Sequence, residues 1–136
     1  GSVVNGITSV VLDIKAEVSN QTQLEEAALN KTQEEYGDLE AQYDLVMMCL
    51  PQTGPPVNRA YIGAFLSIYD DYWCQKVSAQ MHEIGHNLGF GHSGRKGDEY
   101  GDTTCFMGAL NEDDGVKMCF NAAKNFQTGW YTNAQE

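Results

Sequence analysis

The sequence predicts one domain of the α+β class. Three apolar or β-branched runs, at residues 7–14, 43–51 and 59–69, are typical of strands. Two later stretches repeat apolar residues at helical spacing and end near Leu88 and Gly129. A chain of 136 residues is long enough to bury a core of its own, so a second domain is not expected.

The first third of the chain is predicted to be a strand followed by a helix. Residues 7–14 are rich in β-branched side chains, and Ser19 and Asn20 then offer side chains that cap helices. The helix is predicted over residues 21–43, which are rich in Glu, Gln, Ala and Leu, with Gly37 as an interruption.

Two strands are predicted in the middle of the chain. Residues 43–51 form a compact apolar run that ends at Pro51 and a turn-rich segment, which indicates a buried strand. Residues 59–69 form a second run with strand character, in which Gly63 indicates a bulge or a close approach of the backbone.

Two core helices separated by a loop are predicted after these strands. The first carries an apolar stripe at steps of four, three and four residues, formed by Val77, Met81, Ile84 and Leu88. Residues 93–104 are polar and rich in glycine, as expected of a loop. The second helix has Phe120, Ala123 and Phe126 at helical spacing, and Gly129 stands where a C-cap residue is expected.

Composition argues against two classes of partner. Eight Lys and Arg residues against nineteen Asp and Glu give a formal net charge of −11, which repels nucleic acid and anionic membranes. The longest apolar run, residues 45–50, is far shorter than the roughly 20 residues that span a bilayer. Gly1 and Ser2 are typical of a cloning remnant, which leaves residues 3–136 as the predicted domain.

All three histidines lie in the segment QMHEIGHNLGFGHSG, residues 80–94. His82 and His86 are one helical turn apart, so their side chains point the same way, about 6 Å apart along the axis. Gly89 permits the chain to turn back, because glycine takes a positive φ without a Cβ penalty, and His92 can then complete a set of three metal ligands. Glu83 points elsewhere and is free to hold a water in the fourth position.

The alternative is that the histidines have no catalytic role. A lone histidine on a helix is usually packed or solvated, and a closed three-histidine site would serve only to stabilise the fold. Structural zinc, however, normally has four protein ligands, often thiolates, whereas this segment offers three nitrogens and a neighbouring carboxylate. The open position therefore favours a catalytic zinc ion.

The cysteines of the chain are Cys49, Cys74, Cys105 and Cys119. An even number in a small domain permits two disulfides in three possible connectivities, with buried free thiols as the alternative. None of the four forms a Cys-x-x-Cys pair, which argues against a thiolate metal site or a redox motif.

The segment HEIGHNLGFGH, residues 82–92, matches the metzincin zinc signature H-E-x-x-H-x-x-G-x-x-H. Within the metzincins the chain most resembles the gametolysin family, the algal cell-wall-lysing metallopeptidases. The resemblance runs from YDLVMMCLP through VSAQMHEIGHNLG and YGD to CFNAAKNFQTGWY, and it covers residues 43–131. It implies a metzincin-like zincin fold, with a mixed sheet, an active-site helix, a methionine turn and a C-terminal helix.

The resemblance also implies roles for individual residues. The zinc ligands are then the three histidines, His82, His86 and His92. Glu83 is the general base, and Met107 forms a hydrophobic floor under the ligands, although a methionine is also an ordinary way to fill a core. Ala109 stands where some metzincins carry a tyrosine that touches the metal, so no tyrosine ligand is predicted.

Two further expectations follow from the same resemblance. In the metzincin fold a strand before the active-site helix lines the cleft and pairs with an extended substrate, and it is predicted at Tyr61, Ile62, Gly63 and Ala64. Cys105 lies two residues before Met107, as a bridged cysteine does in the reprolysin branch. Cys119 opens the final predicted helix, so a disulfide between Cys105 and Cys119 is predicted to tie the methionine turn to that helix, and Cys49 would then pair with Cys74.

The predicted function is a secreted, monomeric zinc endopeptidase that cleaves extracellular or cell-wall proteins. Glu83 removes a proton from the zinc-bound water that attacks the peptide carbonyl, and then passes that proton to the leaving amine. One alternative is an inactive zinc-bearing binding module, which has no need of a base at this position. The other is a zinc hydrolase of another amide, such as a deacetylase, against which the full eleven-residue motif argues.

Overall fold

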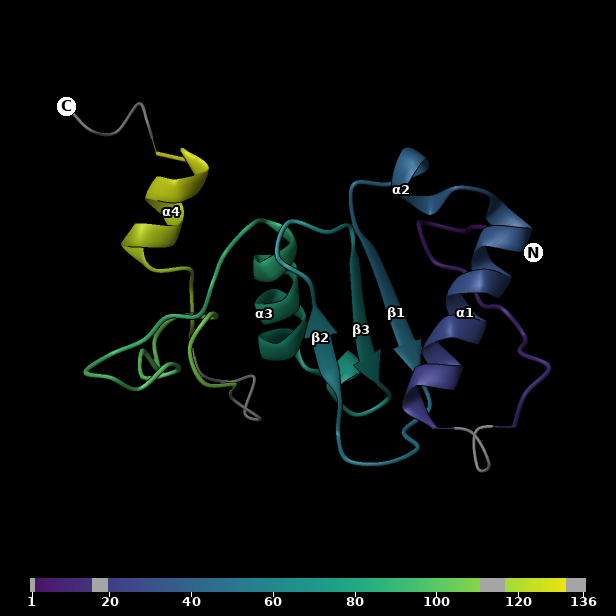
Figure 1. Cartoon of the computed structure of the whole chain (residues 1–136). Helices are drawn as coiled ribbons and strands as arrows, with labels where there is room; N and C mark the ends of the chain where they lie inside the picture. Colours follow the sequence, from purple (N-terminus) through teal and green to yellow (C-terminus); the bar gives the residue numbers. More distant parts are fainter. Residues whose placement is uncertain (1, 16–19, 111–116, 132–136) are drawn as a thin grey trace.

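The computed structural model describes residues 2–15, 20–110 and 117–131. Within these ranges a small sheet lies between helices, with α1 on one side and α3 on the other (Figure 1). None of the helices in the described ranges is long and apolar enough to cross a membrane.

The sheet has three strands in the order β1-β3-β2. Strand β1 (Val46–Leu50) runs parallel to the central strand β3 (Leu66–Asp70), and β2 (Asn58–Ala60) runs antiparallel to β3. The sheet is therefore mixed, and the predicted α+β class is confirmed.

Helix α1 (Gln21–Tyr36) has the N-cap that the sequence predicts. The Asn20 side chain accepts a hydrogen bond from the Gln23 N–H, and the Gln23 side chain accepts one from the Asn20 N–H, which forms a capping box. The other predicted cap, Ser19, lies outside the described residues. Gly37 ends α1, and the short helix α2 (Leu39–Gln42) follows, so the predicted interruption is confirmed.

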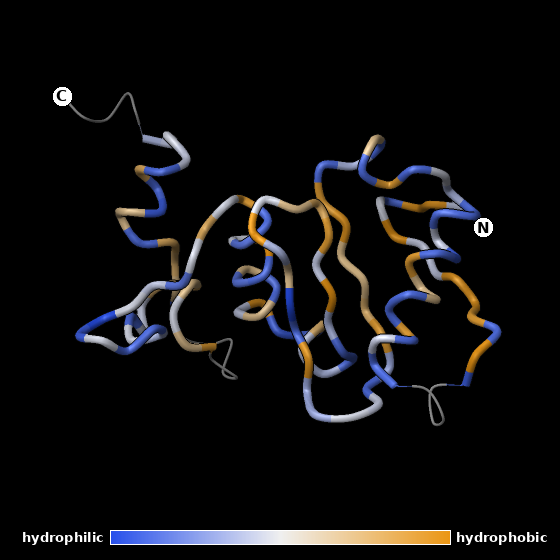
Figure 2. Tube along the Cα trace, viewed as in Figure 1, coloured by the Kyte–Doolittle hydropathy of each residue, from blue (hydrophilic) through white to orange (hydrophobic). Residues whose placement is uncertain are grey.

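The larger hydrophobic core lies between α1 and one face of the sheet, and its buried members are Leu24, Ala28, Leu39, Met48 and Leu50. Figure 2 shows hydrophobic residues along β1, but only alternate residues of this strand are buried. Met47 and Cys49 alternate with these buried residues, so they point to the other side of the sheet and are exposed. The prediction of a buried strand is thus correct for one face.

Residues 7–14 do not form the predicted strand. Val4 and Ile7 exchange main-chain hydrogen bonds across a tight turn, and the following segment contacts the larger core through Leu12. Ile7 and Val11 are 74% and 80% exposed. High β propensity does not make a strand where no neighbouring strand pairs with the segment, because cross-strand contacts supply the stability.

The predicted strand at residues 59–69 is in fact two strands and a connection. Strand β2 ends at Ala60, β3 begins at Leu66, and the connection includes Tyr61, Ile62, Gly63 and Ala64. Gly63 has a φ of 74° and donates its N–H to the His86 carbonyl at 2.8 Å, so it is a turn residue and not a bulge within a strand. The four residues therefore do not form an edge strand, and the edge strand beside α3 is β2.

Helix α3 (Val77–Asn87) forms where predicted, on the sheet face opposite to α1. Leu66 and Ile68 of β3 pack toward α1, whereas Tyr69, which follows Ile68 and points to the other face, donates its hydroxyl proton to the Gln80 carbonyl of α3. The predicted apolar stripe is not the buried face, since Val77 and Leu88 are 51% and 40% exposed. The buried positions are Ser78, Ala79, His82, Glu83, Gly85, His86 and Asn87.

Helix α4 (Ala122–Thr128) lies on the side of α3 that faces away from the sheet (Figure 1). Gly129 ends it in the left-handed conformation, as predicted. None of its residues, all of which the structure describes, is buried, and Phe126 is 72% exposed. The predicted helix is confirmed, but its prediction as a core helix is wrong, because the core contact is made by Phe120 in the segment before α4.

One of the two predicted disulfides is present. It joins Cys49 of β1 to Cys74 in the short helix η2 (Trp73–Gln75). Cys105 and Cys119 are free thiols, although their main chains are neighbours in a parallel bridge. The Cys105 sulfur is buried and accepts hydrogen bonds from the Ser93 hydroxyl and the Asn121 N–H, so it is engaged elsewhere and the predicted bond to Cys119 is not formed.

Candidate active site

The three histidines of the chain converge on one point. His82 and His86 project from successive turns of α3, and His92 comes from the segment that follows the helix. One ring nitrogen of each residue lies within 4.8 Å of the other two. Gly89, with a φ of 91°, turns the chain back toward α3, which a side-chain-bearing residue rarely does.

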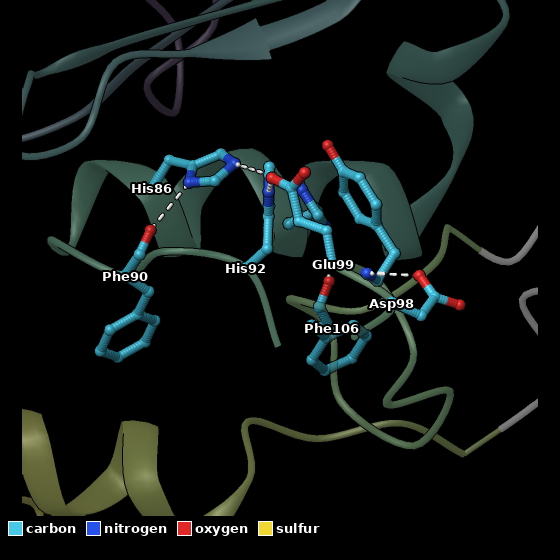
Figure 3. A network of polar contacts seen from close by, with 8 residues as sticks. His86, Phe90, His92, Asp98, Glu99 and Phe106 are labelled. Atoms are coloured by element: carbon cyan, nitrogen blue, oxygen red, sulfur yellow. Dashed lines mark hydrogen bonds and ion pairs between the residues drawn. The ribbon is translucent and has the colours of Figure 1, made fainter. Parts of the chain in front are cut away.

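Main-chain carbonyls set the tautomers of the two helical histidines. His82 Nδ1 lies 2.7 Å from the Phe106 carbonyl oxygen, and His86 Nδ1 lies 2.8 Å from that of Phe90 (Figure 3). A carbonyl oxygen only accepts hydrogen bonds, so Nδ1 must carry the proton in both rings. The Nε2 atom of each neutral ring is then left with a lone pair for a metal ion.

The third histidine is held in a different way. His92 Nδ1 lies 2.5 Å from Oε1 of Glu99, a residue of the loop at residues 93–104 (Figure 3). Its Nε2 atom lies 3.2 Å from Nε2 of His86, so the two atoms face the same point. The ring of Tyr100 packs against His92 with a centroid separation of 4.2 Å. All three histidines thus have an outer partner at Nδ1 and an inward-facing Nε2.

Burial favours the uncharged form of the helical histidines. His82 is 4% exposed, and burial is the main reason that its pKa is lowered to about 4. Burial also lowers the pKa of His86. Both rings are therefore neutral near pH 7, which is the protonation state in which imidazole binds a metal.

Glu83 is buried beside these rings and is held by the edge strand. Burial raises its pKa to about 7, against the opposing effect of hydrogen bonds from Asn58 and the Ala60 backbone. The Asn58 Nδ2 atom lies 2.6 Å from Oε1 of Glu83. A carboxyl group with a pKa near 7 is suited to both accepting and releasing a proton at neutral pH.

Met107 is fully buried beneath α3, in a small core formed with Phe90, Cys105 and Phe120. A Cβ atom added at Gly85 would overlap the Met107 sulfur and would come within 3.0 Å of the Phe120 ring. The glycine between the two helical histidines therefore allows Met107 to pack directly against the ligand helix. That these residues form a methionine turn remains a prediction.

Three residues of the site were not identified from the sequence: Asn58, Glu99 and Tyr100. Asn58 precedes Glu83 by 25 residues, and Glu99 follows His92 by seven residues in an irregular loop. No periodicity or spacing rule connects such pairs. The block YGD that supports the family resemblance includes Tyr100, but it does not indicate that this ring packs on His92.

A sequence profile of the gametolysin peptidase M11 family matches residues 60–136, which is more than half of the chain. The chain belongs to this family. The resemblance seen in the sequence is thereby confirmed, and membership of the gametolysin family implies a metallopeptidase that acts on protein or peptide substrates. The three-histidine cluster lies inside the matched range and is a candidate metal site. No curated protein matches the chain.

Proposed function

We propose that this chain is a zinc endopeptidase in which His82, His86 and His92 hold the metal and Glu83 is the general base. The observation that carries the proposal is the convergence of three histidine nitrogens beside a buried carboxylate. The donor set fits zinc, because catalytic zinc sites use three protein ligands and keep a fourth position open for water or substrate.

Residues of the chain would then accept and donate the proton that the reaction transfers. Zinc supplies a Lewis acid that lowers the pKa of water to about 7 and polarises a carbonyl group. Glu83 takes the proton of the attacking water and gives it to the amine of the departing peptide. Asn58 and the Ala60 backbone keep the Glu83 carboxylate in one orientation during both transfers.

We place the substrate backbone along β2 and not at residues 61–64. Within the described residues β2 pairs only with β3, so its other edge is available to an extended peptide. Ala60 and Asn58 of this strand both contact Glu83, which brings that edge to the catalytic carboxylate. A peptide paired with β2 would present its carbonyl groups close to the histidine cluster.

We also propose that the enzyme is secreted and acts on extracellular or cell-wall proteins. The Cys49–Cys74 disulfide supports this, because disulfides persist in oxidising compartments. The resemblance to the algal cell-wall-lysing peptidases supports the same class of substrate.

Two substitutions test whether the protein is a peptidase or an inactive binding module. Glu83→Ala should keep about one zinc ion per chain but lose casein cleavage by about 10²- to 10⁴-fold or more, because one carboxylate serves both proton transfers. His86→Ala should instead lose most of its zinc. Zinc content is measured by elemental analysis, with Glu34→Ala, an exposed carboxylate of α1, as the control.

The control variant should match the wild type in both zinc content and cleavage. If Glu83→Ala cleaves casein as fast as the wild type, the assigned base is wrong. If the wild type is loaded with zinc, free of inhibitor and still cleaves neither casein nor short peptides, the chain is a binding module.

A further inference from the structure

The hydrogen bonds made by Nδ1 of the three histidines differ, because only that of His92 goes to a side chain, Glu99. His82 and His86 donate to main-chain carbonyls, whereas His92 donates to the carboxylate of Glu99 (Figure 3). We propose that Glu99 is a positioning residue that orients His92 and strengthens it as a metal ligand. This inference rests on the proposed metal site.

His92 is the ligand that most needs such support. The two other histidines are fixed by the backbone of α3 and are 4% and 8% exposed. The side chain of His92 is 22% exposed and projects from an irregular segment. Without a hydrogen-bond partner at Nδ1 its ring would be less restricted about the side-chain bonds, and ordering it would then reduce the affinity for the metal.

The turn that precedes Glu99 is well defined. Arg95 and Asp98 exchange two main-chain hydrogen bonds, of 2.8 Å and 3.1 Å. Lys96 and Gly97 between them have φ angles of 54° and 86°, as a type I′ turn requires at both central positions. Glu99 follows this turn directly, so its main-chain direction is set by the turn.

The same loop is tied to the segment that carries Met107. The Ser93 N–H donates to the Met107 carbonyl at 2.6 Å, and the Ala109 N–H donates to the Tyr100 carbonyl at 2.9 Å. Glu99 therefore lies in a stretch that is anchored on both sides. The main chain that carries Glu99 is thus already ordered, so less conformational freedom is lost when its carboxylate meets His92.

Tyr100 completes the support of His92. Its ring packs against the His92 ring at 4.2 Å, with an angle of 38° between the planes. Glu99 and Tyr100 are consecutive residues, so one short stretch contacts both the Nδ1 edge and a face of the same imidazole. This combination limits the rotation of His92 more than the hydrogen bond would alone.

A carboxylate acts on the ligand more strongly than a carbonyl because it carries a full charge. Donation from Nδ1 to a carboxylate makes Nε2 more basic, and outer partners of this kind are typically worth 10- to 100-fold in metal affinity. The Glu99 side chain is 69% exposed, so water screens part of its charge. We therefore expect an effect of about tenfold, at the lower end of that range.

The test measures binding of zinc itself to Glu99→Ala and Glu99→Gln, by competition with a chromogenic chelator. Glu34→Gln is the matched control, since the Glu34 side chain is 71% exposed and lies on α1, across the sheet from the histidines. Glu99→Ala should bind zinc about tenfold more weakly than the wild type, and Glu99→Gln should lose less because its amide oxygen still accepts a hydrogen bond. With cobalt(II) in place of zinc, the visible spectrum should change in Glu99→Ala and not in Glu34→Gln.

Wild-type zinc affinity and an unchanged cobalt spectrum in Glu99→Ala would overturn the proposal. An equal loss in Glu34→Gln would also overturn it, because the effect would then be one of overall charge. If circular dichroism shows that Glu99→Ala does not fold, an unaltered affinity and spectrum in Glu99→Gln overturn it instead. Failure of the wild type to bind zinc would refute the metal site, and it is a separate result.

Discussion

Gly85→Ala tests the contact between the ligand helix and Met107. Alanine is favoured over glycine in a helix interior by about 0.8–1.0 kcal/mol, so substitution in an isolated helix would be stabilising. Here the new methyl group would overlap the Met107 sulfur and lie 3.0 Å from the Phe120 ring. Both side chains are buried, and forcing them to move typically costs about 1–3 kcal/mol. The two effects together predict a net loss of about 1 kcal/mol in the free energy of unfolding.

The same substitution should weaken zinc binding. Met107 follows Phe106, whose carbonyl accepts the hydrogen bond from His82 Nδ1. A shift of Met107 therefore disturbs the acceptor that orients His82. Urea unfolding with and without zinc measures both effects, and Gly54→Ala is the control because a Cβ there meets no atom within 4 Å.

A double substitution shows whether Met107 is the cause. Shortening the methionine in Gly85→Ala/Met107→Ala removes the overlap, so the double variant should lose less stability than the two single losses added together. Should Gly85→Ala prove about 1 kcal/mol more stable than the wild type, helix propensity alone would decide the outcome and the packing argument would be refuted.

Four further predictions concern the base, the floor of the site and the cysteines. Asn58→Leu should lower casein cleavage while zinc content stays at the wild-type level, because the amide that holds Glu83 is lost; full activity would contradict the positioning role. Met107→Leu is nearly volume-conserving and should keep the fold and zinc, at a cost below about 1.5 kcal/mol in urea unfolding, with modestly altered activity; complete loss of metal would contradict it. Reduction of the Cys49–Cys74 bond, which closes a separation of 25 residues, should cost about 3.5 kcal/mol. In the folded protein an alkylating reagent should modify Cys119 before the other free cysteine, and mass mapping of peptides checks this order.

Local sequence was sufficient for the elements whose signals lie within a few residues of each other. The Asn20 cap, the interruption at Gly37 and the C-cap at Gly129 are all formed as expected, because each depends on hydrogen bonds or φ angles inside one turn. The convergence of the three histidines was also predictable from local sequence. Two of them share a helix face, and a glycine turn returns the third over only six residues.

Tertiary contacts decided the features that depend on partners far away in the chain. Residues 7–14 have strand composition but pair with no strand among the residues that the structure describes, and residues 59–69 fold back at the Gly63 turn, which contacts the end of α3. On α3 the histidines and Glu83 are buried and Val77 is exposed, whereas Met81 of the predicted apolar stripe packs against the small core that contains Met107.

The residues that hydrogen-bond to Glu83 and His92 were likewise not predictable from the sequence. Asn58 meets Glu83 only because β2 packs beside α3, and Glu99 meets His92 only because a type I′ turn folds the loop back. Hydrogen-bond partners across such distances are selected by the packing of whole elements. The spacing of residues along the chain predicts which residues are the metal ligands, whereas the orientation of each ligand depends on the folded arrangement around it.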